Sequence, residues 1–218
     1  MAKRPIFIPN EKGFPMVREE MIEFVWFSGF SVQQKQRSIA SLHESAELSL
    51  GVTPILEISS KADSAAGREL SAFNLLIDDP GLGQATSVEA AFQGSKVFED
   101  GGPHIDLYKR SAREARRDPR LKESGELIGF EFDGRRWELE PRTAFYEWIY
   151  LHALQEHPEL AKHLPDYRGF TDIEFNPKRS INCQARAAAL YVALASRELL
   201  TAAIETPERY LQLISMEE

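Results

Sequence analysis

Apolar and polar positions alternate with two different periods along the chain, and these periods predict both strands and helices. Residues 6–8 and 22–26 are rich in strand-forming side chains and predict two strands near the start. Ser31 then predicts the first cap of a helix over residues 32–48, with an apolar stripe that includes Ile39 and Leu42. Gly51 stands where glycine usually ends a helix.

The second half of the chain repeats both kinds of pattern. Residues 129–139 alternate apolar and polar around Asp133-Gly134, which predicts a hairpin. Thr143 precedes a long amphipathic pattern, and residues 185–204 are rich in alanine, so both stretches predict helices. We therefore expect an α+β fold, a mainly helical single domain with a small sheet and hairpins.

The length of 218 residues fits one large domain. Within it, we expect residues 1–50 to form an N-terminal extension packed on a catalytic core of residues 51–218.

Residues 86–98 read as the central helix of the chain. Glu89, Gln93 and Lys96 follow each other at helical spacing, so a helix would place all three on one face beside Gly94, which would let a ligand approach. Such a face is either a solvated set of polar groups or a polar binding site. The loop that follows contains Gly101-Gly102, whose backbone amides would lie next to these side chains.

Three further stretches carry candidate chemistry, and each has a structural alternative. Ser59-Ser60-Lys61 ends an apolar strand, where hydroxyls and an ammonium suit a diphosphate or simply cap a turn. Phe73-Asn74 offers an aromatic face and an amide to a planar base, or a buried phenylalanine to the core. Asp172, Glu174 and Asn176 precede the alanine-rich helix, where a polar cluster forms an anion site or a capping turn.

Residues 109–122 contain seven basic residues against two acidic ones. As one helix, this stretch would present a basic face to a nucleic-acid backbone. The alternative is a solvated face that pairs with the acidic remainder of the protein. Asp118-Pro119 is a point at which this helix can be interrupted. The proposed backbone contacts are Arg113, Arg116, Arg117 and Arg120.

Composition narrows the class of protein. The net charge is −8 and the isoelectric point about 5.3, which argues against a general nucleic-acid coat. No apolar run reaches the length of a membrane span, and the first residues do not read as a secretory signal. Cys183 is the single cysteine, and five scattered histidines form no metal-binding motif. We expect a cytoplasmic protein without membrane partners, metal or cofactor, and Cys183 as a small packed residue.

The central stretch resembles the signature helix of the NADAR (YbiA-like) superfamily, whose members act on ADP-ribose and related ribosides. The matching pattern is Thr86-x-x-Glu89-x-x-x-Gln93-x-x-Lys96-x-Phe98.

Two weaker motifs agree with this resemblance. Phe73-Asn74 resembles the family's motif of serine, asparagine and phenylalanine, with the last two in reversed order. Asp172 followed by Asn182 resembles its C-terminal motif, although Phe175-Asn176 stands where Trp-Gly is usual.

More closely, the whole chain is similar to the NADAR antitoxins that accompany DarT-type DNA ADP-ribosyltransferase toxins. This resemblance implies a glycohydrolase that removes ADP-ribose from guanine bases in DNA, with ADP-ribosylated DNA, ADP-ribose and a paired toxin as partners. The alternatives are a module that binds ADP-ribose or NAD without cutting it, and an antitoxin that sequesters its toxin.

Cleavage of such an N-glycosidic bond needs a carboxylate near the anomeric carbon. Glu89 is the expected catalytic group, with Asp172 as a second acid or a ligand of ribose hydroxyls. The residues expected to hold the substrate are Ser59, Ser60, Lys61, Phe73, Asn74, Phe92, Gln93, Lys96, Gly101, Gly102 and Asn182.

Overall fold

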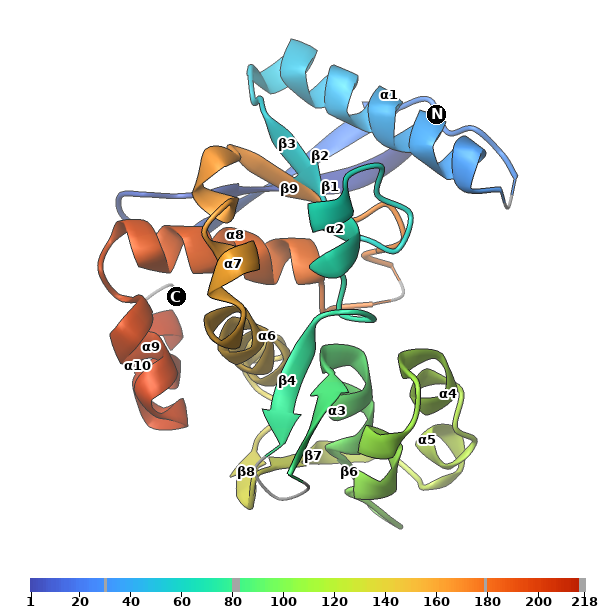
Figure 1. Cartoon of the computed structure of the whole chain (residues 1–218), viewed down its shortest axis with the longest axis vertical. Helices are drawn as coiled ribbons and strands as arrows, with labels where there is room; N and C mark the ends of the chain where they lie inside the picture. Colours follow the sequence, from blue (N-terminus) through green and yellow to red (C-terminus); the bar gives the residue numbers. More distant parts are fainter. Residues whose placement is uncertain (30, 80–82, 179, 216–218) are drawn as a thin grey trace. The chain divides into compact units, whose positions relative to one another are not determined.

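The computed structural model describes residues 1–29, 31–79, 83–178 and 180–215. In it, strands from distant parts of the chain form one sheet. Contacts divide the chain into two compact units. Unit 1 consists of Met1–Ser71 and Pro158–Glu218, and unit 2 consists of Ala72–His157. Each combines helices with small sheets (Figure 1), which confirms the predicted α+β class.

The sheet of unit 1 has the strand order β2-β1-β9-β3. Its strands are β1 (Ala2–Pro9), β2 (Val17–Phe24), β3 (Ile55–Glu57) and β9 (Gly169–Thr171). β1 is antiparallel to both β2 and β9, whereas β3 is parallel to β9. The register aligns Glu57 with Thr171, so the end of β3 lies beside the polar segment that follows β9.

Helix α1 (Val32–Leu50) covers part of this sheet with the predicted apolar stripe. Ser31 accepts a hydrogen bond from the backbone of Gln34, and Gly51 ends the helix with a left-handed φ of 68°. Ile39 and Leu42 are buried against strand residues of β1 and β2. Both predicted caps of this helix are therefore confirmed.

Helix α8 (Gln184–Ser196) contacts β1, β9 and β2, and Figure 1 shows it on the opposite side of the sheet from α1. The predicted single helix over residues 185–204 is wrong, because α8 ends before Glu198, whose φ is 59°, and a separate helix begins at Leu200. The remaining helices of unit 1 are α2 (Ala65–Glu69), α7 (Pro158–Ala161), η2 (Leu164–Asp166), α9 (Leu200–Glu205) and α10 (Pro207–Ser215).

Unit 2 contains a strand pair, a three-stranded sheet and short helices around the long helix α6. Its strands are β4 (Leu76–Asp79), β5 (Gln84–Ser87), β6 (Lys96–Phe98), β7 (Leu127–Phe132) and β8 (Arg135–Trp137). Its helices are α3 (Val88–Gly94), η1 (Ile105–Lys109), α4 (Ala112–Arg116), α5 (Arg120–Glu123) and α6 (Ala144–Glu156). The β7–β8 hairpin turns at Asp133-Gly134, both with positive φ, as predicted.

An aromatic cluster fills the core of unit 2. The ring of Phe145 in α6 lies 4.6 Å from that of Phe130, 5.6 Å from Trp137 and 6.2 Å from Phe92, between ring centroids. All four side chains are buried. Because Phe92 belongs to α3, this cluster anchors the short helix that carries Glu89.

The predicted helix over residues 86–98 is shorter than expected. Thr86 lies in β5, which pairs with β4, and its hydroxyl donates to the backbone of Tyr108. Lys96 lies in β6, which pairs with β7. Strand pairing at both ends therefore overrides the helical pattern, and Lys96 does not share a helix face with Glu89 and Gln93.

The basic stretch of residues 109–122 is not one helix either. Ser111 begins α4 with a capping box to Glu114, and Pro119 precedes the separate helix α5. The predicted continuous basic face of four arginines is therefore wrong, and its members lie on two short helices and the turn between them.

Candidate functional site

Glu89 lies in the first turn of α3 and is buried. Its side chain accepts a hydrogen bond of 3.0 Å from the amide of Gln93, and both residues are only 7% exposed. Arg116 places its guanidinium Nε 3.8 Å from the same carboxylate oxygen. The interpretation of this face as solvated is contradicted by the burial, so α3 holds a carboxylate in a protein environment with one cation beside it.

The same arginine links Glu89 to the predicted aromatic motif. The guanidinium carbon of Arg116 lies 5.7 Å from the ring centroid of Phe73, within the range of a cation–π contact. Phe73 is half-buried, and Asn74 is exposed. Phe73 also lines a hollow of about 390 Å³ on unit 2, together with Thr86. Arg116 therefore lies beside both Phe73 and Glu89 within unit 2.

The charges of Glu89 and Arg116 affect the pKa of Lys96. Its ammonium nitrogen lies 4.9 Å from the ring centroid of Phe92. Burial lowers the pKa of the Lys96 ammonium, while the negative charge of Glu89 acts in the opposite direction. Phe92 itself packs against Phe130, Phe145 and Tyr146, which is the packing of a core side chain.

The glycines of this region have packing roles. A side chain at Gly94 would lie 2.5 Å from the ring of Tyr108, so the space that we expected a ligand to use is occupied by that ring. Gly102 has a φ of 90° and approaches the backbone of Lys96 too closely for a side chain. Gly101 pairs with Phe98 through its backbone carbonyl, at 2.7 Å.

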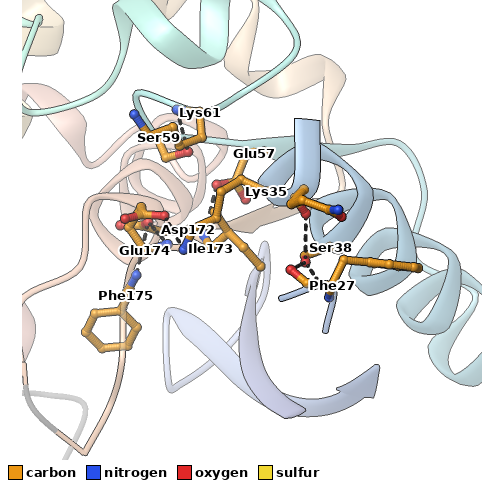
Figure 2. Close-up of polar contacts among 11 residues, drawn as sticks. Phe27, Lys35, Ser38, Glu57, Ser59, Lys61, Asp172, Ile173, Glu174 and Phe175 are labelled. Atoms are coloured by element: carbon orange, nitrogen blue, oxygen red, sulfur yellow. Dashed lines mark hydrogen bonds and ion pairs between the residues drawn. The ribbon is translucent and has the colours of Figure 1, made fainter. Parts of the chain in front are cut away.

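In unit 1, Asp172 follows β9 and is held by three hydrogen-bond donors. The backbone amides of Glu174 and Phe175 donate to Oδ1 at 2.9 Å and 3.2 Å, and the amide of Gln184 donates to Oδ2 at 3.0 Å. Figure 2 shows Asp172 with Glu174 and Phe175, next to Glu57. Burial first, and the negative charge of Glu57 second, raise the pKa of the Asp172 carboxyl.

Glu57 is a second buried carboxylate in the same place. The hydroxyl of Thr171 donates to Oε2 at 2.7 Å, and the amide of Ile173 donates to Oε1 at 2.9 Å. A hydrogen bond with the Ser59 hydroxyl is a further contact of this carboxylate. Burial raises the pKa of Glu57, whereas its hydrogen bonds lower it. The hydroxyl of Ser59 is therefore hydrogen-bonded to Glu57. That the same hydroxyl binds a diphosphate remains a prediction.

This carboxylate pair predicts that stability falls as the pH rises. Both folded-state pKa values are raised, so the folded protein keeps protons that the unfolded chain releases above about pH 4. The stabilisation is complete below that pH and is lost as the pH rises through the folded pKa values. We expect Asp172→Asn to flatten the decline in melting temperature between about pH 5 and 8, in contrast to the exposed Asp63→Asn. Equal slopes in the three proteins would contradict this expectation.

The remaining predicted residues of unit 1 differ in exposure. Ser60 is exposed, whereas Lys61 is half-buried and its backbone amide donates to Ser59. Asn182 is half-buried, and its Oδ1 has no hydrogen-bond partner within the described part of the chain. Cys183 is buried, which confirms the prediction of a packed residue, and burial raises the pKa of its thiol.

The basic residues of unit 2 divide into two kinds. The guanidinium of Arg120 donates to both Asp106 and Asp118, with shortest distances of 2.8 Å. Arg113 and Arg117 line a hollow of about 420 Å³. The alternative of pairing with acidic groups therefore describes Arg120, while Arg113 and Arg117 are exposed.

Among the described residues, no helix has the length and apolar character needed to cross a membrane. The same residues contain no group of three or more histidine, cysteine, aspartate or glutamate side chains arranged to hold a metal ion.

A protein-family model described as DarT1-associated NADAR antitoxin matches residues 2–218. The chain belongs to this family. A search of curated proteins found no match. The match covers the N-terminal stretch as well as both units, so residues 2–50 are part of the DarT1-associated NADAR sequence pattern. Membership implies a paired toxin of the DarT1 type.

Sequence reasoning missed several residues that surround the carboxylates of this NADAR protein. Glu57, Thr171 and Gln184 were not among the predicted site residues, although all three are buried, Thr171 is hydrogen-bonded to Glu57, and Gln184 is hydrogen-bonded to Asp172. One signal was present, because Glu57 is a lone carboxylate in the apolar run of residues 55–58. A charge in a buried strand requires partners, and their identity depends on the pairing of β3 with β9.

Proposed function

We propose that the protein is an ADP-ribosyl glycohydrolase that removes ADP-ribose from guanine bases in DNA, in the cytoplasm, and thereby acts as the antitoxin to a DNA ADP-ribosyltransferase. The observation that carries the proposal is Glu89. It is a buried carboxylate in the stretch that resembles the NADAR signature, with Gln93 and Arg116 fixing its position. Family membership supports the antitoxin part of the proposal.

The reaction transfers the anomeric carbon from a base nitrogen to water. The water oxygen bonds to that carbon and its proton passes to Glu89, while the carbon–nitrogen electron pair moves to the base nitrogen. The base nitrogen then takes a proton, and Asp172 is the proposed acid, because its raised pKa keeps a proton available near neutral pH. Negative charge at Glu89 also stabilises the oxocarbenium-like transition state.

The other predicted site residues are proposed ligands of the substrate, taken separately for each unit. In unit 2, the proposed ligands are Phe73 and Arg116 for a planar base and Lys96 for phosphate. In unit 1, Ser60 and Lys61 are proposed for the diphosphate. The Oδ1 of Asn182, which has no hydrogen-bond partner among the described residues, is an acceptor that a ribose hydroxyl would satisfy.

The test is to incubate the protein with DNA that a DarT-type toxin has modified, and to measure free ADP-ribose. Release of ADP-ribose and recovery of unmodified DNA are expected. Tight binding of ADP-ribose without release would replace the hydrolase with a binding module. A stable complex with the unmodified toxin, without removal of ADP-ribose from DNA, would show that the protein is a sequestering antitoxin and not a hydrolase.

DNA contact by the arginines gives a separate prediction. Arg113 and Arg117 are exposed, so we expect both to contact phosphates, whereas Arg120 is already occupied by Asp106 and Asp118. In a plot of log binding constant against log salt concentration, Arg113→Gln and Arg117→Gln should each reduce the slope by about 0.7–0.9. Arg120→Gln is the matched control, and an equal effect there would contradict the assignment.

A further inference from the structure

Glu57 is a buried carboxylate to which the proposed reaction assigns no role. It is 4% exposed at the end of β3. Its two carboxylate oxygens bind Thr171 and Ile173, the residues on either side of Asp172. Glu57 therefore contacts both neighbours of Asp172, through the side-chain hydroxyl of Thr171 and the backbone amide of Ile173, and Figure 2 shows the contact with Ile173.

A chain of hydrogen bonds extends from Glu57 to α1. Thr171 Oγ1 lies 2.8 Å from His43 Nε2. Because the single hydroxyl proton of Thr171 points to Glu57, its oxygen accepts from the Nε2–H of a neutral His43. Burial lowers the pKa of His43 to about 4, which favours that neutral form. His43 and Glu57 both line a hollow of about 660 Å³ beside α1.

Burial raises the pKa of Glu57, and hydrogen bonds donated to its carboxylate limit that rise, because they favour the ionised form. Thr171, Ile173 and Ser59 together supply three of them. An ionised Glu57 in turn opposes the ionisation of Asp172, since both carboxyls are buried.

Other charges surround the pair. Glu174 adds negative charge to both carboxyls and is itself paired with Lys35 of α1, at 2.9 Å. Arg4 of β1 faces Asp172 and Glu174 with positive charge, and Cys183 before α8 has a buried thiol. Among these groups of the described chain, Glu57 is the one that is hydrogen-bonded to both neighbours of Asp172.

We propose that Glu57 is a positioning residue that keeps Asp172 in its protonated, proton-donating form, and that Thr171 and His43 keep Glu57 ionised for this purpose. The proposal rests on the proposed function, in which Asp172 is the acid. Glu57 acts through Asp172 and transfers no proton itself. Its charge sets the pH at which Asp172 loses its proton, and hence the pH above which hydrolysis fails.

The first measurement is the pH dependence of ADP-ribose release. Glu57→Gln preserves the shape of the side chain and removes its charge, so the alkaline limb of the profile should move to lower pH by about 1–3 units. Thr171→Val removes the hydroxyl and should move the limb in the same direction. Thr171→Ser keeps the hydroxyl and should restore the original profile. Glu44→Gln, on the exposed surface of α1, is the control.

The second measurement is independent of activity. Carbon-13 NMR of labelled aspartate, assigned with Asp172→Asn, follows the carboxyl of Asp172 directly. A lower titration midpoint in Glu57→Gln supports the proposal, and an unchanged midpoint overturns it. If the wild type releases no ADP-ribose, the proposed function fails while this titration still decides the role of Glu57. If Glu57→Gln does not fold, different midpoints in Thr171→Val and Thr171→Ser support the proposal and equal midpoints overturn it.

Discussion

Replacing Glu89 with glutamine is expected to slow the release of ADP-ribose from modified DNA by roughly 10²–10⁴-fold. The amide keeps the size of the side chain and can still contact Gln93, but it neither accepts the proton of water nor stabilises positive charge on the sugar. Binding of ADP-ribose should therefore survive. Single-turnover release and equilibrium binding, measured on the same preparation, separate the two effects.

Glu126→Gln is the matched control for this experiment, because Glu126 is an exposed carboxylate of the same unit. It should leave the rate unchanged. Undiminished release by Glu89→Gln would remove Glu89 from the mechanism. Loss of both release and binding would instead assign it a role in holding the substrate.

Replacing Phe145 with alanine is expected to lower the free energy of unfolding of unit 2 by about 3–5 kcal/mol. Its ring packs against Phe92, Phe130 and Trp137, so the substitution leaves a cavity beneath α3. Glu89 loses its support at the same time, and release of ADP-ribose should fall together with stability.

Unit 2 can be followed on its own by fluorescence. In a Trp26→Phe background the remaining tryptophans, Trp137 and Trp148, both lie in unit 2 and contact each other, with ring centroids 5.1 Å apart. Denaturant unfolding of this variant with and without Phe145→Ala measures the loss. Phe14→Ala is the control, because that ring is exposed in unit 1. A loss below about 1 kcal/mol for Phe145→Ala would show that the core closes around the missing ring.

Local signals in the sequence predicted the elements that depend on few residues. The caps at Ser31 and Gly51 locate α1, and Asp133-Gly134 locates the β7–β8 turn, because each acts through the backbone of its immediate neighbours. The pairing of Glu57 with Thr171 joins residues 114 positions apart. No periodic pattern contains that information, so the partner of Glu57 could not be predicted.

Residues 86–98 show how tertiary structure overrides a helical pattern. Glu89 and Gln93 are neighbours in a helix, as their spacing predicted, because they lie within one helical turn. Thr86 and Lys96 are in strands, because β4 and β7 offer them backbone partners that a local pattern does not record. The prediction of Glu89 as a site residue thus depended on its spacing from Gln93, which is a local feature of the sequence.

The division of unit 1 into two segments of the chain has a consequence for synthesis. Residues 72–157 leave the ribosome as one continuous stretch and make unit 2 without later residues. β9 lies between β1 and β3 in the sheet, so that sheet is incomplete until residues 169–171 emerge. A chain cut short before this point carries Glu89 but lacks Asp172 and leaves Glu57 without Thr171 and Ile173. The buried carboxylate pair is thus assembled only by a nascent chain that has passed β9.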